Sequence, residues 1–276
     1  MAKKAFVVGI NDYPFEGSDL NGCVNDAHAW AELLINHYDF AGADVRIITD
    51  AAATKANLIA GLKDLLRGAM SGDVLVFTNS SHGSYLADKS GDEPDKFDEM
   101  MCPYDIAENP LLDDDLRELF ADLPSGVSLT VISDSCFSGT VTRADLSGVP
   151  GAGRSPDDRR VRFLNPGLFG KPVISRPFRE WLKSRLKRQE KYPESGMKEI
   201  LLSGCTDREY SYDASIGGVY HGAMTYFALQ AIREANYKIT YRQLHSRVNY
   251  LLDHSDYPQH PRLEGKLKNK KKQIFA

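Results

Sequence analysis

Short apolar runs rich in β-branched residues alternate with segments of helical periodicity, and this alternation constrains the fold more than any other feature of the chain. Near-continuous apolar runs of this kind are typical of strands that helices cover on both faces. The alternation therefore predicts an α/β protein with a mostly parallel sheet. The expected strands are Ala5–Ile10, Val45–Thr49, Val74–Thr78, Leu129–Ser133 and Glu199–Ser203.

Helical patterns fall between these strands and after the last one. Thr54 is a typical N-cap for a helix that Gly68 would end, and the acidic residues at 113–115 suit a first helical turn. In a sheet of this kind, ligand sites lie beyond the carboxyl ends of the strands, so the residues that follow strands are the first functional candidates. The expected helices are Asn25–Tyr38, Lys55–Arg67, Asp113–Phe120, Gly222–Ala235 and Tyr241–Asp253.

Charge and cysteine usage exclude several classes of protein. The 276-residue chain has a formal net charge of −4, whereas proteins that bind nucleic acid or membrane surfaces carry an excess of positive charge. No apolar run approaches the length of a membrane span or a signal-peptide core. The four cysteines are far apart, with neither zinc nor disulfide spacing. We therefore expect a cytoplasmic protein with free thiols.

Two chemically reactive side chains follow expected strands that would be neighbours in the sheet. Cys136 comes after Leu129–Ser133, and His82 comes after Val74–Thr78. An imidazole can take the proton of a thiol and leave a nucleophilic thiolate. Taken singly, Cys136 could be a buried strand-end thiol and His82 a loop histidine. Their joint placement favours a catalytic pair, whereas Cys205, with no histidine near it in sequence, fits a small core residue.

An ordered set of motifs resembles those of metacaspases and bacterial caspase-like peptidases. The run Asp134-Ser-Cys-Phe-Ser-Gly139 is similar to their nucleophile motif, and Ser80-Ser-His-Gly-Ser84 is similar to their histidine motif, although position 81 is usually glycine there. The resemblance covers about residues 5–264 and leaves only the middle loop unmatched. The other similar segments are Gly9–Tyr13, Leu20–Ala27, Gly91–Asp95, Asp98–Glu99, Asp113–Asp115, Leu202–Asp207, Gly217–Gly218 and Gly222–Tyr226.

The resemblance implies a caspase-like three-layer fold, with a mostly parallel central sheet flanked by helices. It implies a cysteine endopeptidase that cuts peptide bonds through a thioester on Cys136, with His82 as proton-transfer partner and the backbone of Gly83 as oxyanion donor. It also implies a substrate pocket that prefers Arg or Lys before the cut bond. A carboxylate pairs well with a guanidinium, which supports this preference. The matching pocket positions are Cys23, Asp26, Ser80 and Asp134.

Purely structural roles for the two pocket aspartates remain as alternatives. Asp26 could be an ordinary first-turn helix residue, and Asp134 could be a carboxylate that caps backbone N–H groups. With the pocket interpretation, the expected partners are protein or peptide substrates with Arg or Lys before the cut. Nucleic acid and membranes are not expected as partners, and the resemblance implies a monomer.

The chain divides into four parts on this resemblance. Residues 1–145 form a large-subunit-like catalytic region, and 146–196 form an irregular basic linker loop with one short helix expected near 178–191. Residues 197–265 are a small-subunit-like region that completes the same sheet, and 266–276 are a basic tail that we expect to be solvated or disordered. A protease that prefers basic residues could process itself in the linker, which could equally bind a partner or be a tolerated surface loop. The basic linker residues include Arg154, Arg159, Arg160, Arg176, Arg185 and Lys187.

Thiol chemistry needs no cofactor, but the acidic stretch after His82 suits the hard oxygen ligands of calcium. The resemblance implies calcium as an activator bound near Asp98, Asp113 and Asp114. Arg143 stands where a further aspartate ligand is expected, with Asp145 two residues on. A solvated acidic loop in which Asp113 caps a helix is the alternative.

Two other classes of function remain as alternatives. A caspase-like domain without catalysis would act as an interaction or scaffold module, and retention of both Cys136 and His82 argues against that class. A small-molecule-binding domain of flavodoxin type is disfavoured because no Gly-rich phosphate loop follows the first strand. The physiological substrate and the activating signal are not encoded in any motif.

Overall fold

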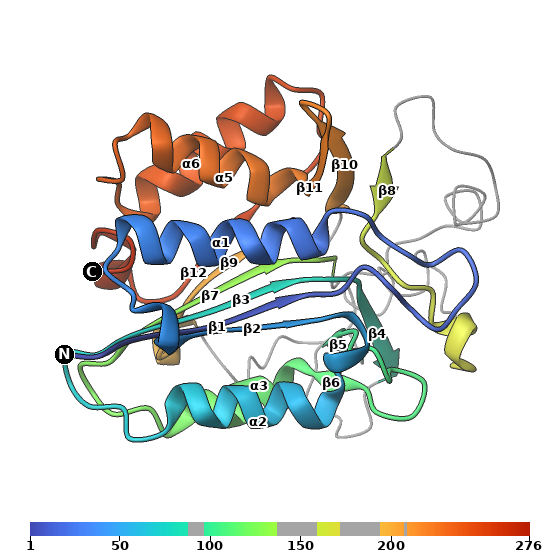
Figure 1. The fold of residues 1–276 in the computed structure, drawn as a ribbon, viewed down its shortest axis with the longest axis horizontal. Helices are drawn as coiled ribbons and strands as arrows, with labels where there is room; N and C mark the ends of the chain where they lie inside the picture. The colour runs from blue at the N-terminus through green and yellow to red at the C-terminus, as the bar shows by residue number, and fades with distance from the viewer. Residues whose placement is uncertain (88–96, 137–158, 172–193, 207–208) are drawn as a thin grey trace, which may run out of the picture.

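A six-stranded sheet forms the centre of the molecule in the computed structural model, which describes residues 1–87, 97–136, 159–171, 194–206 and 209–276 (Figure 1). The strand order is β12-β9-β7-β3-β1-β2. All neighbouring strands are parallel except β12, which is antiparallel to β9. The predicted mostly parallel α/β sheet is confirmed. The strands are β1 (Lys3–Gly9), β2 (Val45–Thr49), β3 (Val74–Ser80), β7 (Ser128–Asp134), β9 (Ile200–Ser203) and β12 (Arg262–Glu264).

Helices cover both faces of this sheet, which gives the three layers visible in Figure 1. On one face lie α1 (Cys23–His37), α5 (Ala223–Glu234) and α6 (Tyr241–Asp253), and on the other lie α2 (Lys55–Leu66) and α3 (Asp113–Ala121). The predicted N-terminal and C-terminal capping residues of α2 are present. The Thr54 hydroxyl accepts a hydrogen bond from the N–H of Asn57, and Gly68 has a φ of +68° just past the helix end.

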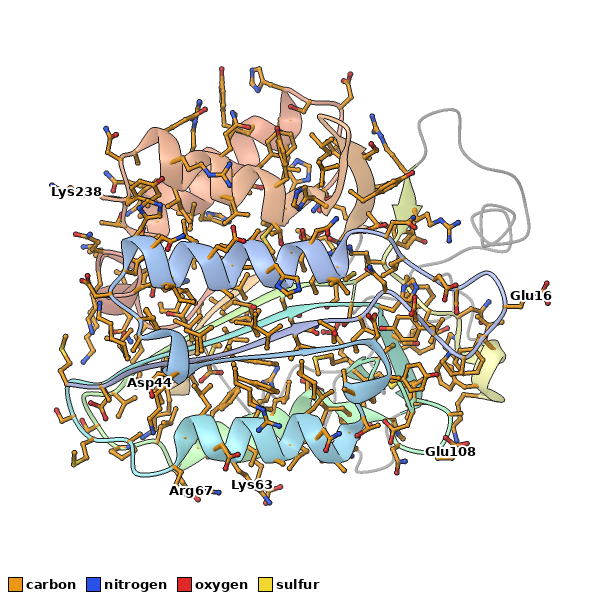
Figure 2. The ribbon with its side chains drawn as sticks, in the orientation of Figure 1. Glu16, Asp44, Lys63, Arg67, Glu108 and Lys238 are labelled. Carbon is orange, nitrogen blue, oxygen red and sulfur yellow. The ribbon has the colours of Figure 1, made fainter. Side chains whose placement is uncertain are left out.

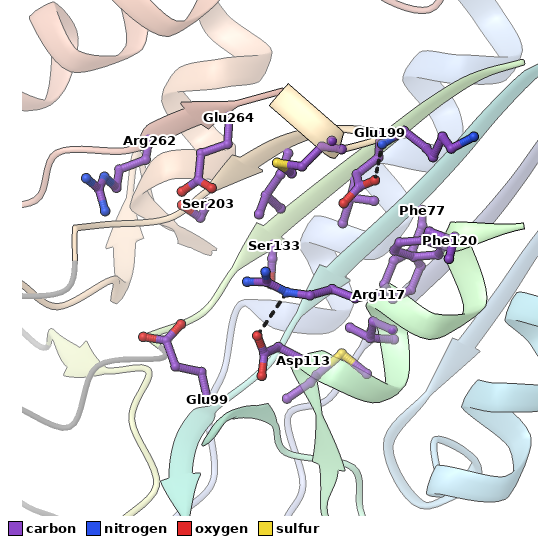
Figure 3. Close-up of a pocket in the computed structure, with 18 of the residues that line it drawn as sticks. Phe77, Glu99, Asp113, Arg117, Phe120, Ser133, Glu199, Ser203, Arg262 and Glu264 are labelled. Atoms are coloured by element: carbon purple, nitrogen blue, oxygen red, sulfur yellow. Dashed lines mark hydrogen bonds and ion pairs between the residues drawn. The ribbon is translucent and has the colours of Figure 1, made fainter. Parts of the chain in front are cut away.

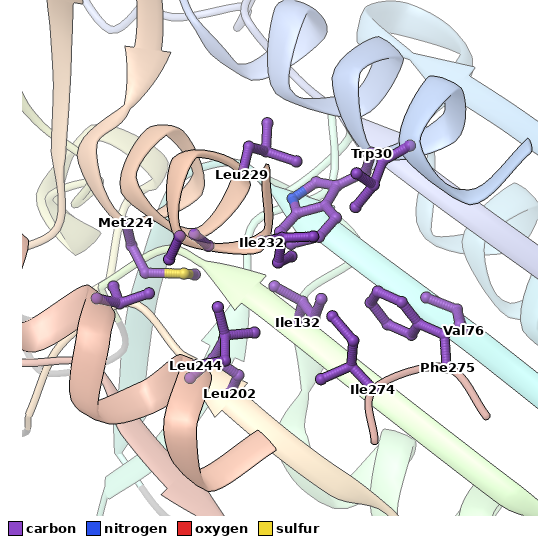
Figure 4. Close-up of a cluster of buried hydrophobic side chains, with 14 of the residues drawn as sticks. Trp30, Val76, Ile132, Leu202, Met224, Leu229, Ile232, Leu244, Ile274 and Phe275 are labelled. Carbon is purple, nitrogen blue, oxygen red and sulfur yellow. The ribbon is translucent and has the colours of Figure 1, made fainter. Parts of the chain in front are cut away.

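Each face of the sheet buries its own hydrophobic core. Figure 4 shows the core under α1, α5 and α6, where Trp30 and Leu229 pack over Ile132 of β7. On the opposite face, Phe6 of β1 stacks on Phe77 of β3 with ring centroids 5.9 Å apart. Burial on both sides explains why the strand sequences read as continuous apolar runs.

Two small antiparallel sheets stand near the carboxyl ends of β1, β3 and β7, and the sequence pattern did not predict them (Figure 1). Their strands are short and carry no clear alternation of apolar and polar residues, so periodicity is a weak signal for them. One contains β4 (Gly83–Ala87), β5 (Phe97–Met101) and β6 (Leu111–Leu112), and the other contains β8 (Arg160–Val161), β10 (Tyr212–Ile216) and β11 (Val219–Gly222). Single 3-10 turns occur at Gly42–Asp44, Asp50–Ala52, Pro166–Phe169 and Glu194–Gly196.

The prediction of a solvated C-terminal tail is wrong at the end of the chain. After the short helix α7 (Leu267–Lys270), Ile274 and Phe275 are 0% and 1% exposed. Phe275 packs edge-on against Trp30 with ring centroids 6.3 Å apart, and its N–H donates to the Tyr241 hydroxyl (Figure 4). The lysines of this segment stay at the surface, whereas the two apolar residues that follow them complete the core.

Charged side chains populate the outside of the molecule. Figure 2 shows Glu16, Asp44, Lys63, Arg67, Glu108 and Lys238 at its periphery. Within the described residues, no helix is both long enough and apolar enough to cross a membrane.

Candidate active site

The parallel pairing of β3 with β7 brings the two predicted catalytic residues to one edge of the sheet. Ser80, at the end of β3, is in register with Asp134, at the end of β7. His82 and Cys136 each follow two residues later, and both side chains are buried. The expectation that these strands are neighbours is therefore confirmed.

The imidazole of His82 is held by contacts from the loop after β1. Its Nε2 atom lies 2.7 Å from the carbonyl oxygen of Ser18, and its backbone N–H donates to the hydroxyl of Tyr13. The Tyr13 ring packs against the imidazole with centroids 4.9 Å apart. Because a carbonyl can only accept, Nε2 carries the proton, and the lone pair is on Nδ1.

Nδ1 of His82 has no hydrogen-bond partner among the described residues. Burial lowers the pKa of His82 from its ordinary value to about 4, and the positive charge of Arg162 adds to this shift. The side chain is therefore a neutral base at physiological pH, with its free lone pair on the nitrogen that the Ser18 contact leaves unused.

Cys136 lies beside the extended backbone of Ser211. The N–H of Ser211 donates to the Cys136 sulfur, and the sulfur also contacts the Ser211 carbonyl oxygen at 3.4 Å. Cys136 packs in one buried cluster with Tyr85, Phe163 and Cys205. Cys205 is buried, as a small core residue would be, although this cluster places it against the expected nucleophile.

A fully buried arginine, Arg162, lies in the predicted substrate pocket. Its Nη2 atom is 2.8 Å from Asp26 and 2.9 Å from Asp213, and its Nη1 atom is 3.6 Å from a carboxylate oxygen of Asp134. Nη1 also donates to the Ser80 hydroxyl. Three of the four predicted pocket residues thus contact this guanidinium directly.

The electrostatics of the pocket strongly favour a cation. Burial alone would lower the pKa of Arg162, but Cys23 and the surrounding carboxylates outweigh that effect and raise it. Burial raises the pKa of Asp134, and Arg162 partly offsets that shift. Cys23, the fourth predicted residue, is completely buried and lines the same charged cluster. Buried charges of this kind persist only when they are paired and hydrogen-bonded.

Several residues of the pocket were missed by the sequence analysis. Asp213 on β10 supplies a third carboxylate to Arg162. On β11, the Nδ1 atom of His221 lies 2.9 Å from the Oδ1 atom of Asp26. The Ser211 hydroxyl donates to Asp134. These three side chains come from the region after β9, and no spacing in the sequence links them to Asp26 or Asp134. Arg162 itself is in the linker but was not among the basic residues singled out there.

The backbone of Arg162 is also bound, on the side that faces Cys136. Its carbonyl oxygen accepts hydrogen bonds from the N–H of Gly83 at 3.0 Å and from the N–H of Cys136 at 3.2 Å. Two converging N–H donors around a carbonyl oxygen form the arrangement that stabilises an oxyanion. The N–H of Gly83, the predicted donor, thus converges on this oxygen with the N–H of Cys136, which the sequence analysis did not include.

The predicted calcium ligands do not form a three-residue cluster. Asp98 is buried on β5, whereas Asp113 begins α3 and makes an ion pair with Arg117 at 3.1 Å. Burial raises the pKa of Asp113 to about 6. Within the described ranges, no group of three or more His, Cys, Asp or Glu side chains could hold a metal ion. Arg143 and Asp145 lie outside the described residues, so the calcium site stays a prediction.

A separate cavity of about 360 Å³ lies between α3 and the sheet (Figure 3). Phe77, Phe120 and Val131 contribute apolar surface to it, and Glu99 and Arg262 are among its charged residues. His82 and Cys136 are not among the residues that line it. We therefore place the candidate active site at the carboxyl ends of β3 and β7 instead.

A family model for the metacaspase, peptidase C14 domain matches residues 3–145, slightly more than half of the chain. The chain belongs to the metacaspase family of peptidases. Metacaspase-1 of Pyricularia oryzae is 32% identical over 287 residues, which cover 95% of this chain and 71% of that protein. Metacaspase-7 of Arabidopsis thaliana is 40% identical over 145 residues, half of this chain and only 35% of that protein.

Solved structures are similar to this chain in fold. A crystal structure of a protein from Geobacter sulfurreducens is 25% identical, with a TM-score of 0.72 over 100% of this chain and 99% of that chain. Caspase-1 from Spodoptera frugiperda is 11% identical, with a TM-score of 0.59 over 95% of this chain and 86% of that chain. The second likeness shows the fold alone, and the predicted caspase-like fold is confirmed.

Proposed function

We propose that this metacaspase is a cysteine endopeptidase that cuts protein substrates after Arg or Lys, with Cys136 as nucleophile and His82 as proton-transfer partner. One observation carries the proposal. A buried arginine fills a pocket of three carboxylates while its carbonyl oxygen lies between the N–H groups of Gly83 and Cys136. A substrate residue before the cut bond needs these same contacts.

Two observations support the proposed chemistry: His82 Nδ1 has no hydrogen-bond partner among the described residues, and two N–H groups converge on the Arg162 carbonyl oxygen. His82 Nδ1 takes the proton of the Cys136 thiol, and the sulfur attacks the carbonyl carbon of the bound residue. The negative charge develops on an oxygen that two N–H donors already contact. His82 then donates its proton to the leaving amine, and a water molecule, activated by the same nitrogen, hydrolyses the thioester.

The pocket explains a preference for Arg over other residues. The terminal nitrogens of Arg162 donate four hydrogen bonds. The acceptors are the Ser80 hydroxyl, the Asp134 backbone carbonyl oxygen and the carboxylates of Asp26 and Asp213. A lysine would keep the charge but could not match the planar fork of donors, so we propose Arg first and Lys second. An acidic residue would add a fourth negative charge to three carboxylates and is excluded.

Regulation and location stay at the level of proposals. We retain self-processing in the basic linker and activation by calcium as hypotheses from the family resemblance. The chain's four cysteines are free and buried, which suits a reducing compartment such as the cytoplasm. A monomer that binds neither nucleic acid nor membranes also remains a prediction.

Cleavage of short fluorogenic peptides ending in Arg, Lys or Asp tests the proposal. Wild type and Cys136→Ala are assayed side by side, each with calcium and with chelator. We expect cleavage after Arg, slower cleavage after Lys, none after Asp, and none by the variant. Cleavage after Asp would refute the pocket assignment, and activity in Cys136→Ala would refute the nucleophile. A complete lack of cleavage would favour the scaffold alternative.

A further inference from the structure

The segment Arg160–Leu164 lies across the candidate active site as an extended chain. On the side before Arg162, β8 pairs with β10, so that Val161 is opposite Tyr212. The N–H of Arg162 donates to the Ser211 carbonyl oxygen at 2.9 Å, and the guanidinium of Arg160 donates to the Asp19 carbonyl oxygen. Addition of a strand to an exposed sheet edge is a common way for proteins to bind a peptide.

The residues after Arg162 are bound as well. Phe163 forms a parallel bridge with Gly83, and its ring stacks on Tyr85 with centroids 6.0 Å apart. The N–H of Leu164 donates to the Gly83 carbonyl oxygen at 2.9 Å, and the Ser84 hydroxyl donates to the Leu164 carbonyl oxygen at 2.7 Å. Leu164 is 1% exposed. Both sides of the Arg162–Phe163 bond are thus held in register with the oxyanion donors.

We propose that the Arg162–Phe163 peptide bond is the chain's own cleavage site, cut by its own Cys136, and that the intact segment keeps the peptidase latent. This inference rests on the proposed function and assigns it one bond. The same contacts define the preferred substrate: a basic residue two positions before Arg, and an aromatic residue followed by Leu after the cut.

The proposed step balances as a hydrolysis. The thiol proton of Cys136 moves to His82 Nδ1, a C–S bond forms at the carbonyl carbon of Arg162, and the C–N bond to Phe163 breaks. The Phe163 nitrogen takes the proton and leaves as an amine. Water then adds to the thioester, the C–S bond breaks, and the thiol regains its proton. The products are a carboxylate on Arg162 and a free amino group on Phe163.

Latency follows from the covalent attachment of Arg162 to the rest of the chain. While the bond is intact, Arg162 is joined to the protein on both sides, and its local concentration at the pocket far exceeds that of an external peptide. A cut separates Arg162 from the contacts of Phe163 and Leu164. The contacts that remain are the pocket, the two residue pairs between β8 and β10, and the bonds of Arg159 and Arg160 to backbone carbonyl oxygens. Because the contacts after the cut bond no longer hold Arg162, an external substrate can compete.

Intact-mass analysis of the purified full-length protein tests the assignment, with calcium and with chelator. Wild type should yield fragments 1–162 and 163–276, and the second should begin with Phe163. The cut should be first order and independent of protein concentration, because the bond is held in the same molecule. Cys136→Ala should stay intact at this bond. Cutting of Cys136→Ala during its own expression would assign the event to another protease and overturn the proposal.

Substitutions of the arginine provide the matched comparison. Arg162→Gln should remain intact at this bond. Arg162→Lys keeps the positive charge, so it serves if the Gln variant does not fold, and it should be cut about 10-fold more slowly than wild type. Arg242→Gln, at an exposed position on α6, should be cut at the wild-type rate. Equal cutting of wild type and Arg162→Lys would contradict recognition through the guanidinium.

The peptide assay separates the two proposals. Wild type that cleaves an external Arg peptide at full rate while its 162–163 bond stays intact would refute self-cleavage and latency, and would leave the endopeptidase standing. Loss of both reactions would refute both. If the proposal is right, external cleavage should show a lag that follows the appearance of the 163–276 fragment.

Discussion

Asp213 places its Oδ1 atom 2.9 Å from the Nη2 atom of Arg162. The same oxygen accepts the N–H of Gly22, and the other carboxylate oxygen accepts the N–H of Asn21. A residue of β10 therefore joins the start of α1 to the candidate substrate pocket. The pocket requires both the N-terminal and the C-terminal parts of the chain, which explains how a change in the connection between them could control it.

Replacement of Asp213 by Asn should weaken recognition of Arg while the shape of the pocket is kept. Loss of one charged partner of a buried guanidinium costs about 1.5 to 3 kcal/mol, so we expect kcat/KM for an Arg peptide to fall roughly 10- to 100-fold. Steady-state kinetics with Arg and Gln peptides measure the effect. Asp44→Asn, at an exposed position, is the control. An unchanged preference for Arg over Gln would show that Asp213 only supports the backbone.

Gly222→Ala should close the pocket to Arg. A Cβ at this position would lie far inside van der Waals contact of the Asp134 carboxylate and of the Arg162 guanidinium. We expect at least a 100-fold loss of cleavage after Arg, in external peptides and at the chain's own bond, since one of these groups must move. Gly42→Ala, where a Cβ meets nothing within 4 Å, is the matched control. Normal Arg cleavage by Gly222→Ala would contradict the pocket geometry.

The buried His82 should make the protein less stable in mild acid. Its folded-state pKa is about 4, below the ordinary value of 6.5, so between these values the unfolded chain binds a proton that the folded chain does not. The contribution of His82 to the free energy of unfolding is constant above about pH 6.5. It falls as the pH drops from 6.5 toward 4. At pH 5 the loss amounts to about 2 kcal/mol.

Urea unfolding at pH 7.5 and pH 5 measures this effect in Cys136→Ala, which cannot cut itself. The same background with His82→Gln serves as the reference, because all other titrating groups are shared by the two proteins. We expect the free energy of unfolding to fall more steeply with acid when His82 is present. Parallel pH curves for the two proteins would show that His82 titrates normally.

Phe275→Ala should destabilise the fold although the residue is the second last of the chain. Its ring is 1% exposed and packs against Trp30, Tyr38 and Tyr241. Removal of a buried aromatic ring costs about 3 to 5 kcal/mol. Urea unfolding of Phe275→Ala beside Lys272→Ala, whose side chain is exposed, measures the difference. Equal stability of the two variants would mean that the tail undocks in solution.

The sequence by itself determined the five parallel strands of the sheet and the neighbouring positions of Cys136 and His82, but not the antiparallel edge strand β12. Continuous apolar runs identify buried parallel strands, and in such a sheet the residues that follow β3 and β7 must emerge at one edge. The same local signals, a capping threonine and a glycine stop, located α2 within one residue. The resemblance to metacaspases also indicated Cys23, Asp26, Ser80 and Asp134 as pocket residues.

Only the tertiary structure decided which residues complete the pocket and what occupies it. Asp213 binds the N–H of Gly22 across 191 residues of sequence, and His221 binds Asp26 across 195. No periodicity encodes such pairings. Arg162 is one of many basic residues in the linker. The composition of the linker alone gave no reason to choose Arg162 over the others as the residue that occupies the pocket. Burial among three carboxylates distinguishes it, because an arginine can leave water only where its charge is matched.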